Sequence, residues 1–267
     1  MKTWKKLLLG LTGVFALTAL AACSSSNNTL DKVKDKGTLT VALNPHFAPF
    51  EFKTIQNGKD TIVGADVEIA KAIADELGVK VKFSEMSFDN VLASVQSGKA
   101  DIAIAGISVT NERKKVYDFS DSYYTAENVV IVKKDKVNDF TSTDSLAKQT
   151  VGTQKGSVQE TVAKKQIPKA SVVSLASNGE MINELKSGQL QAVVLEKAIA
   201  EGYIAQNDDL TLANFNLKSD GTDAYAVATR KGSDDLLKEI NAVIKETKDS
   251  GKFDQWLKEA STYKQSK

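Results

Sequence analysis

The amino-acid sequence predicts an α/β fold built from two units, each with a mostly parallel sheet flanked by helices. From residue 39, short apolar runs alternate with amphipathic helical stretches in the order strand, helix, strand, helix, strand. A second series with the same alternation begins near residue 128. Residues 92–102 and 182–192 also look alike, since each has a helical stretch, a Ser-Gly stop and a buried strand. These observations indicate two α/β units of similar design.

The first 22 residues are predicted to be a signal peptide rather than part of the fold. Three lysines lie among the first six residues, and an apolar stretch follows from residue 7 to residue 20. This stretch is too short and ends too abruptly for a stable membrane span. The chain is therefore expected to be exported.

The end of the leader, Leu20-Ala21-Ala22-Cys23, resembles a bacterial lipobox. Cys23 is the only cysteine of the chain and so has no disulfide partner, and lipid (palmitate) modification accounts for it better than a free thiol. We expect lipidated Cys23 to hold the protein at the outer face of the bacterial cell membrane. Residues 23–37 are expected to form the lipid-anchored tether. The alternative is a plain secretory signal with an incidental cysteine.

Composition excludes several functional classes. The whole chain of 267 residues has a net charge of +1, and removal of the three leader lysines leaves −2, which argues against a nucleic-acid partner. With one histidine and one cysteine, zinc or thiol catalysis lacks its residues, so no metal and no cofactor are expected. About 240 residues remain after the leader, enough for two compact lobes.

The elements of the first unit follow from apolar periodicity and from glycine, proline and capping residues. Asp66 is placed as the N-cap of a helix that ends at Gly78. Strands are expected at residues 39–43, at the end of an aromatic-rich loop of residues 46–52, and at residues 79–83 and 102–105, with helices at residues 67–77 and 88–95.

The second unit is read in the same way. Gly156-Ser157 is predicted to open a helix that runs to residue 165. Strands are expected at residues 128–132, 150–152, 171–175, 192–195 and 224–228, and helices at residues 181–186, 197–206, 234–248 and 253–259.

The stretch from residue 100 to residue 113 carries the first chemical signal. A buried strand is broken at Gly106, Ser108 and Thr110 supply hydroxyl groups, and Arg113 follows in a short helix. A guanidinium fork beside hydroxyl and amide donors suits a carboxylate. The alternative is an ordinary strand-to-helix turn with a surface arginine. Since Glu196 ends a strand of the second unit, the two strand edges would form one cleft if they faced each other.

Five sequence pieces together resemble a known family. They are Ala48-Pro-Phe-Glu51, Gly64-Ala-Asp-Val-Glu-Ile69, Gly106-Ile-Ser-Val-Thr-Asn-Glu-Arg113, Asp118-Phe-Ser120 with Tyr123-Tyr124, and Gly156-Ser157. In this order they resemble the extracellular solute-binding proteins (family 3) of polar amino-acid ABC importers. The sequence departs from that pattern at Ala65, where the family usually has a larger residue.

The resemblance implies a two-lobed, periplasmic-binding-protein-like fold of type II with two hinge crossings. It places the crossings near residues 125–129 and 221–225. Residues 38–125 and 225–267 would form lobe 1, and residues 126–224 would form lobe 2.

The resemblance also assigns the residues that grip an α-amino acid. Arg113 would bind the α-carboxylate, with help from the backbone N–H of Ser108 and from the helix N-terminus at Gly156-Ser157. The carbonyl of Gly106 and the hydroxyl of Ser108 would take the α-ammonium group. Glu196 would supply its counter-charge where the family usually has aspartate. The alternative for Glu196 is that it only caps the following helix.

The pocket for the ligand side chain is assigned in the same way. Phe47 and Phe88 match positions that sandwich the side chain in relatives, although both could equally belong to the core. Ala105 precedes the binding loop and is counted with it. Asn44 stands where several relatives carry aspartate, and Asp66 is a further candidate beside it.

The predicted function is that of a monomeric, lipid-anchored receptor without enzymatic activity. It would bind a free polar L-α-amino acid, with a neutral amide or basic side chain, by hinge closure and deliver it to an ABC permease with a cytoplasmic ATPase. The alternatives are a dehydratase-like cleft enzyme that uses Glu196 as acid or base, and an adhesin or sensor domain. The ligand is left open among glutamine, arginine, histidine, lysine and cystine.

Overall fold

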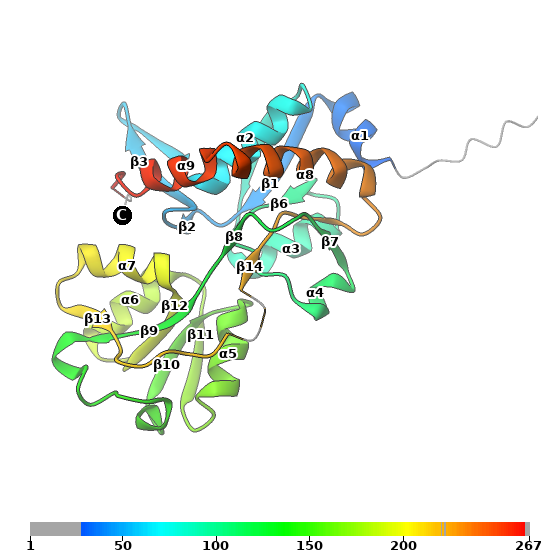
Figure 1. The fold of residues 1–267 in the computed structure, drawn as a ribbon. Coiled ribbons are helices and arrows are strands. Elements are labelled where there is room, and N and C mark those ends of the chain that lie inside the picture. Colours follow the sequence, from blue (N-terminus) through cyan, green and yellow to red (C-terminus); the bar gives the residue numbers. More distant parts are fainter. Residues whose placement is uncertain (1–27, 220, 222, 265–267) are drawn as a thin grey trace, which may run out of the picture.

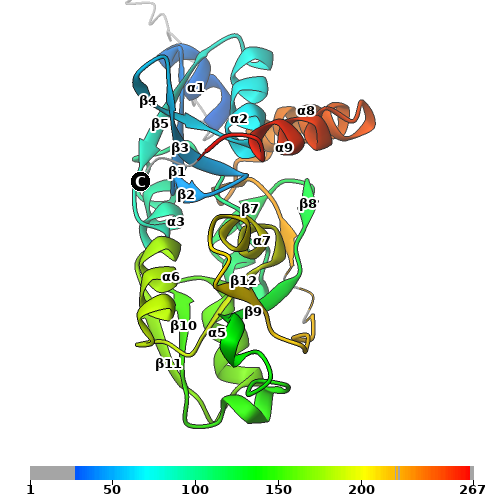
Figure 2. The ribbon, with the colours of Figure 1, turned by 90° about the vertical axis from the view of Figure 1, so that its left-hand side faces the viewer.

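The computed structural model describes residues 28–219, 221 and 223–264. Two α/β lobes lie one above the other, each organised around a five-stranded sheet (Figure 1, Figure 2). The predicted two-unit α/β architecture is therefore confirmed. The predicted signal peptide and Cys23 lie outside the described residues. No helix within the described ranges has the length and apolar character needed to cross a membrane.

Lobe 1 contains the sheet with strand order β5-β1-β6-β15-β7. β1 pairs in parallel with both β5 and β6, with Val41 opposite Ile102, whereas β15 is antiparallel to β6 and β7. The elements of this lobe are α1 (Thr29–Lys36), β1 (Thr38–Leu43), β2 (His46–Phe47), β3 (Glu51–Gln56), β4 (Lys59–Val63), α2 (Ala65–Glu76), β5 (Lys80–Glu85), α3 (Phe88–Gln96), β6 (Ile102–Ala103), α4 (Asn111–Lys114), β7 (Tyr117–Phe119), β15 (Ala228–Arg230), α8 (Asp234–Asp249) and α9 (Lys252–Ala260).

Helix α1 corrects part of the expected tether. Asn28 caps α1 by accepting a hydrogen bond from the backbone N–H of Asp31, and the helix ends at Gly37 in the left-handed conformation. Val33 is completely buried in the lobe 1 core. Residues 29–36 therefore belong to the fold, and the tether prediction was wrong for them, because two large apolar side chains, Leu30 and Val33, in a short lysine-rich stretch are a weak helix signal.

The start of α2 also differs from the prediction. Its N-cap is Gly64, not Asp66, and the N–H groups of Ala65 and Asp66 donate to the carbonyls of Pro49 and Phe50. A Cβ atom on Gly64 would lie 2.0 Å from the carbonyl oxygen of Phe50, so only glycine fits there. Asp66 is thereby placed in the first helical turn, where it is buried.

Lobe 2 contains the sheet with strand order β11-β10-β12-β9-β13. β10 is parallel to β11 and β12, whereas β9 is antiparallel to β12 and β13. Its elements are β9 (Asn128–Lys133), the 3-10 helices η1 (Lys134–Lys136) and η2 (Thr143–Leu146), β10 (Thr150–Gln154), α5 (Val158–Gln166), β11 (Ser171–Leu175), α6 (Asn178–Ser187), β12 (Ala192–Glu196), α7 (Lys197–Gln206) and β13 (Leu210–Leu212).

Two short strands run between the lobes. β8 (Tyr124–Thr125) and β14 (Ala224–Tyr225) pair in antiparallel fashion, and Figure 1 shows both in the segment that links the two lobes. The single strand expected at residues 224–228 is in fact divided into β14 and β15. It is divided because the chain changes partners, with the N–H of Ala226 donating to the carbonyl of Ile107 before β15 joins the main sheet.

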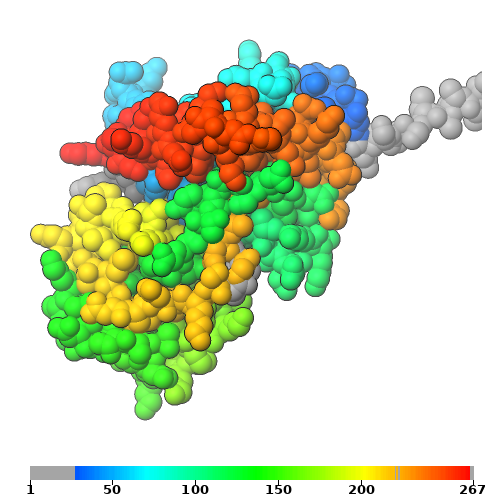
Figure 3. Space-filling view, viewed as in Figure 1, coloured from blue at the N-terminus to red at the C-terminus, as the bar shows by residue number. Residues whose placement is uncertain are grey.

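Helices α8 and α9 return the chain to lobe 1, and Figure 3 shows them (orange to red) across the front of that lobe, above the yellow α7. α8 is strongly amphipathic, and its apolar side, which includes Leu236, Ile240 and Ile244, is buried. Phe253 of α9 packs against Tyr123 with ring centroids 5.6 Å apart. The C-terminal helices therefore cover the part of lobe 1 from which the crossing strands depart.

Candidate functional site

The two lobes face each other across a cleft, and side chains from both sides bridge it. The ammonium group of Lys155 lies 2.9 Å from a carboxylate oxygen of Asp89. Near it, a cavity of about 380 Å³ is lined by Thr110, Glu112 and Arg113 of lobe 1 and by residues 156–158 and Thr161 of lobe 2. That volume lies within the range of small-molecule sites.

The loop after β6 supplies the lobe 1 wall of the site. Gly106 has a φ of +54°, and a Cβ atom there would lie 2.5 Å from the Phe47 ring, so this position requires glycine. Its backbone N–H donates to Oδ2 of Asp66 at 3.0 Å. Ser108 is buried and forms a β-bridge with Tyr225 on the second crossing strand. The loop is thus held by Asp66 of α2 and by Tyr225 of the crossing strand β14.

Arg113 lies at the centre of this wall, on the short helix α4. Thr110 caps that helix by accepting from the Arg113 N–H. The guanidinium donates to the carbonyls of Ser108 at 2.7 Å and Gly156 at 3.2 Å, and it stacks 6.0 Å from the centre of the Phe88 ring. Burial lowers the pKa of Arg113 to about 10, so the group stays charged at neutral pH. Its hydrogen bonds within the described residues go to neutral carbonyls, which leave its charge available to an anion.

The N-terminus of α5 faces Arg113 from lobe 2. Gly156 precedes it with a φ of +79°, and Ser157 is the N-cap residue. The Ser157 hydroxyl donates to the carbonyl of Gln154 at 2.7 Å and makes no capping bond to the helix. The first N–H groups of α5 therefore have no side-chain cap, which suits an anion at this helix end.

Glu196 lies at the end of β12 and is buried. It occupies the N-cap position of α7 but forms no side-chain cap there, so capping alone does not account for it. Its Oε1 instead accepts from the amide of Gln159 at 2.6 Å, and Gln159 also donates to Asn128 at 2.7 Å. Burial raises the pKa of Glu196 to about 7. Glu196 also interacts electrostatically with Arg113, so opposite charges from the two lobes share one cleft.

Asn44 bridges the lobes through its side-chain amide. Its Nδ2 donates to the carbonyl of Met86 at 2.8 Å, and its Oδ1 accepts from Gln154 of lobe 2 at 3.3 Å. The predicted Asn44 therefore lies in the cleft, where its polar atoms contact both lobe 1 and lobe 2.

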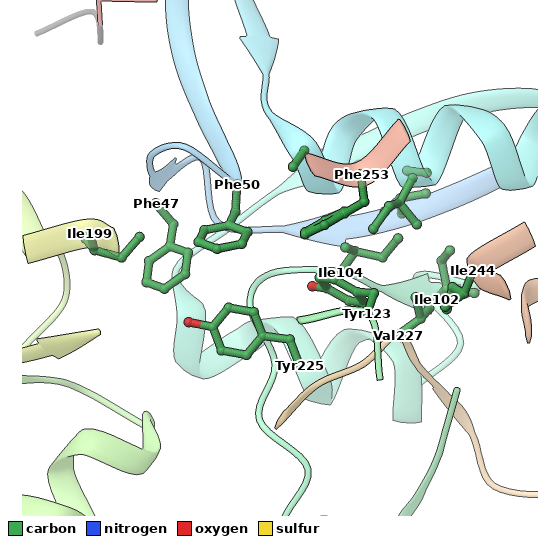
Figure 4. Packing of buried hydrophobic residues seen from close by; sticks show 14 of the residues in the cluster. Phe47, Phe50, Ile102, Ile104, Tyr123, Ile199, Tyr225, Val227, Ile244 and Phe253 are labelled. Carbon is green, nitrogen blue, oxygen red and sulfur yellow. The ribbon is translucent and has the colours of Figure 1, made fainter. Parts of the chain in front are cut away.

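The two predicted phenylalanines lie in different surroundings. Phe47 packs against Phe50 and Tyr225, with ring centroids 5.7 and 6.3 Å apart, and Figure 4 shows it between Phe50 and Ile199 of lobe 2. Phe88 contacts Arg113 instead. The pair is therefore not arranged as one stacked sandwich in this structure. Ala105 is buried in the core beside the loop.

Three residues of the site were missed by sequence reasoning. Gln154 and Gln159 flank the Gly156-Ser157 pair, and each places an amide in the cleft. Tyr225 is completely buried, and Figure 4 shows its hydroxyl turned toward lobe 2. The two glutamines could have been predicted from the sequence, because both are polar residues next to the predicted helix start at Gly156-Ser157. Tyr225 gave no such signal, because its position depends on the crossing.

Two α/β lobes joined by a pair of crossing strands, with opposite charges on the facing walls of the cleft, define a two-lobed binding protein that encloses a small charged ligand. The comparisons agree with this class. Residues 39–260 match the family of bacterial extracellular solute-binding proteins, family 3. The chain belongs to this family, as its sequence predicted.

Individual relatives extend over nearly the whole chain. The chain is 35% identical to an arginine-binding extracellular protein of Bacillus subtilis, over 97% of each sequence. It is 33% identical to an ABC transporter glutamine-binding protein of the same organism, over 94% of this chain and 96% of that protein. Among solved structures, an amino acid ABC transporter substrate-binding protein of Streptococcus pneumoniae bound to L-arginine is 51% identical, with a TM-score of 0.84 over 86% of this chain and 97% of that one.

Proposed function

We propose that this protein binds a free α-amino acid between its lobes, with L-arginine as the first candidate, for uptake by an ABC importer. The observation that carries this proposal is the pair of opposite charges on facing walls, Arg113 from lobe 1 and Glu196 from lobe 2. An α-amino acid carries one carboxylate and one ammonium group on a single carbon and would complement both. The arginine-bound relative supports L-arginine.

We propose the residue roles that the family resemblance implies, and the geometry of the two walls supports them. Arg113 would grip the α-carboxylate, with the Ser108 N–H and the uncapped start of α5 at Gly156-Ser157 as further donors. The Gly106 carbonyl and the Ser108 hydroxyl would take the α-ammonium, and Glu196 would neutralise it. The ligand side chain would extend toward Phe47 and Phe88, past Ala105, with Asn44 as the polar contact, and with Gln154 beside it.

Ligand would be enclosed by a hinge motion. We propose that residues 38–125 with 225–267, together with helix α1, move as one body and residues 126–224 as another, about the crossing strands β8 and β14. The Asn44–Gln154, Arg113–Gly156 and Lys155–Asp89 contacts join the two bodies and would form only on closure. The closed form would be the one that the permease, with its cytoplasmic ATPase, recognises.

The cellular setting is proposed from the leader and the family. Residues 1–22 would be cleaved, and lipidated Cys23, with residues 24–28 as a short tether before α1, would anchor a monomeric receptor at the outer face of the membrane. We infer that the protein is not an enzyme. Glu196 has a pKa near neutrality, as an acid or base would, but a bound α-ammonium would hold it ionised and occupied.

A thermal-shift panel tests the proposal. The domain from Ser24 is freed of ligand by unfolding and refolding and is then heated with each of the twenty amino acids and cystine at millimolar concentration. A ligand present at about a hundred times its Kd should add about 2.7 kcal/mol of stability. A large shift with L-arginine, or with another amino acid of basic or amide side chain, supports the proposal, and the absence of any shift refutes it.

A further inference from the structure

Two carboxyl groups, Glu51 and the pocket candidate Asp66, are buried together behind the ligand loop, where Asp66 contacts that loop rather than the cleft. Glu51 begins β3 and Asp66 lies in the first turn of α2, and both are almost completely inaccessible to solvent. The two side chains interact with each other. Among the described residues, no lysine or arginine contributes to the pKa shift of either carboxyl.

The hydrogen bonds around Asp66 favour the ionised form of this carboxyl over that of Glu51. Oδ2 of Asp66 accepts from the Gly106 N–H at 3.0 Å and from the Tyr123 hydroxyl at 2.9 Å, so Asp66 acts as an acceptor. Its Oδ1 and both oxygens of Glu51 have no ordinary donor among the described residues. A buried acceptor without a donor is costly, and two adjacent buried carboxylates cannot both be charged. One proton between Glu51 and Asp66 relieves both costs.

We propose that neutral Glu51 donates a hydrogen bond to ionised Asp66 and that this pair positions Gly106 for the ligand, which makes Glu51 a positioning residue. The helix dipole at the start of α2 favours the charge on Asp66, while no such partner favours a charge on Glu51. The direction of the pKa shifts agrees, since burial raises the pKa of Glu51 well above its usual range and that of Asp66 to about 6.

The pair also connects the ligand loop to the lobe crossing. Tyr123, the second donor to Asp66, directly precedes β8, and its N–H donates to the carbonyl of Tyr225 on β14 at 3.0 Å. One carboxylate thus holds both the loop that would receive the ammonium group and the chain that leads into the hinge. The ionisable groups that face the pair are Tyr123 and, from the other elements, Tyr225 and Glu196.

Two substitutions at one position separate the hydrogen bond from mere packing. Glu51→Gln keeps an N–H donor for Asp66, whereas Glu51→Met fills the same space without one. Calorimetric titration with L-arginine should give a Kd within threefold of wild type for Glu51→Gln and a Kd at least tenfold weaker for Glu51→Met. An unchanged Kd for Glu51→Met would overturn the positioning role.

Two readouts need no ligand, so they stay informative even if the proposed function, on which the titration rests, fails. Infrared difference spectra of wild type against Glu51→Gln at pH 8 should contain the carbonyl band of one buried neutral carboxylic acid. Hydrogen exchange at the Gly106 amide should be at least tenfold faster in Glu51→Met than in Glu51→Gln. A missing acid band refutes the shared proton, and equal exchange rates refute the link to Gly106. If Glu51→Met does not fold, the shared proton is tested by the carboxylic-acid band in the difference spectrum of wild type against Glu51→Gln.

Discussion

Ligand affinity should depend on pH through Glu196, because the proposed ammonium site requires this carboxyl to be ionised. Burial raises the pKa of Glu196 to about 7 in the empty protein. At pH 6 about nine in ten molecules would therefore hold the wrong protonation state for an ammonium ligand, and at pH 8 about one in ten would. Only the ionised fraction binds, so Kd should be about tenfold tighter at pH 8 than at pH 6, or about 1.4 kcal/mol.

Calorimetry measures the number of protons that are released when the ligand binds. Titration with L-arginine at pH 6 in buffers of different ionisation enthalpy should show the release of about 0.9 proton per ligand, and at pH 8 about 0.1. Glu196→Gln is the matched control, and the release of about 0.9 proton is the difference between wild type and this variant, because any release from Asp66, whose pKa is raised to about 6, occurs in both proteins. The same substitution should flatten the affinity profile between pH 7 and pH 8. No proton release from wild type at pH 6 would refute the placement of the ammonium group at Glu196.

The same shift has the opposite consequence for the empty protein. The folded-state pKa of Glu196 is raised above its ordinary value of 4.5, so the folded chain holds this proton more tightly than the unfolded chain does. The contribution of Glu196 to stability is therefore complete below pH 4.5 and is lost as the pH rises through 7. Ligand binding should tighten with pH while this contribution to the stability of the empty protein falls.

Three further changes test separate parts of the structure. Gly64→Ala should lower the free energy of unfolding by at least about 2 kcal/mol, because the added Cβ meets the carbonyl of Phe50, and a melting temperature within 1 °C of wild type would contradict the required close approach. Lys155→Met should weaken ligand binding by less than about 1 kcal/mol, since its cross-lobe ion pair with Asp89 is partly exposed, and a loss of more than 2 kcal/mol in titration would show that it does more than close the cleft. Cys23→Ala should abolish fatty-acid labelling in cells, and unchanged labelling would contradict the proposed anchor.

The sequence predicted most elements because their signals are local. The strand at residues 171–175 and the helix at residues 197–206 were predicted with the bounds that the structure shows. They combine clear apolar runs with polar or turn-forming boundaries. The errors arose where tertiary contacts decide. Asp66 has the residue type of an N-cap, but the carbonyls of Pro49 and Phe50 take the first N–H groups of that helix and shift its start.

The candidate site was predicted unevenly for a related reason. Arg113 and Ser108 lie within one contiguous stretch, so their chemistry could be read together, and Glu196 was found from its place at a strand end. The Gln159–Glu196 bond and the burial of Tyr225 join segments far apart in the chain. No periodicity or spacing encodes these features: the first depends on the packing of α5 against β12 within lobe 2, and the second on the packing of the crossing strand β14.

The most direct test of the account compares L-arginine with agmatine, which keeps the guanidinium and ammonium groups but lacks the α-carboxylate. Both compounds are titrated calorimetrically into wild type and into Arg113→Ala at pH 8. We expect tight binding of L-arginine to wild type only, with agmatine at least a hundredfold weaker, and a comparably large loss of L-arginine binding in Arg113→Ala. If agmatine bound wild type as tightly as L-arginine, or if Arg113→Ala retained affinity for L-arginine, Arg113 would not be the carboxylate site.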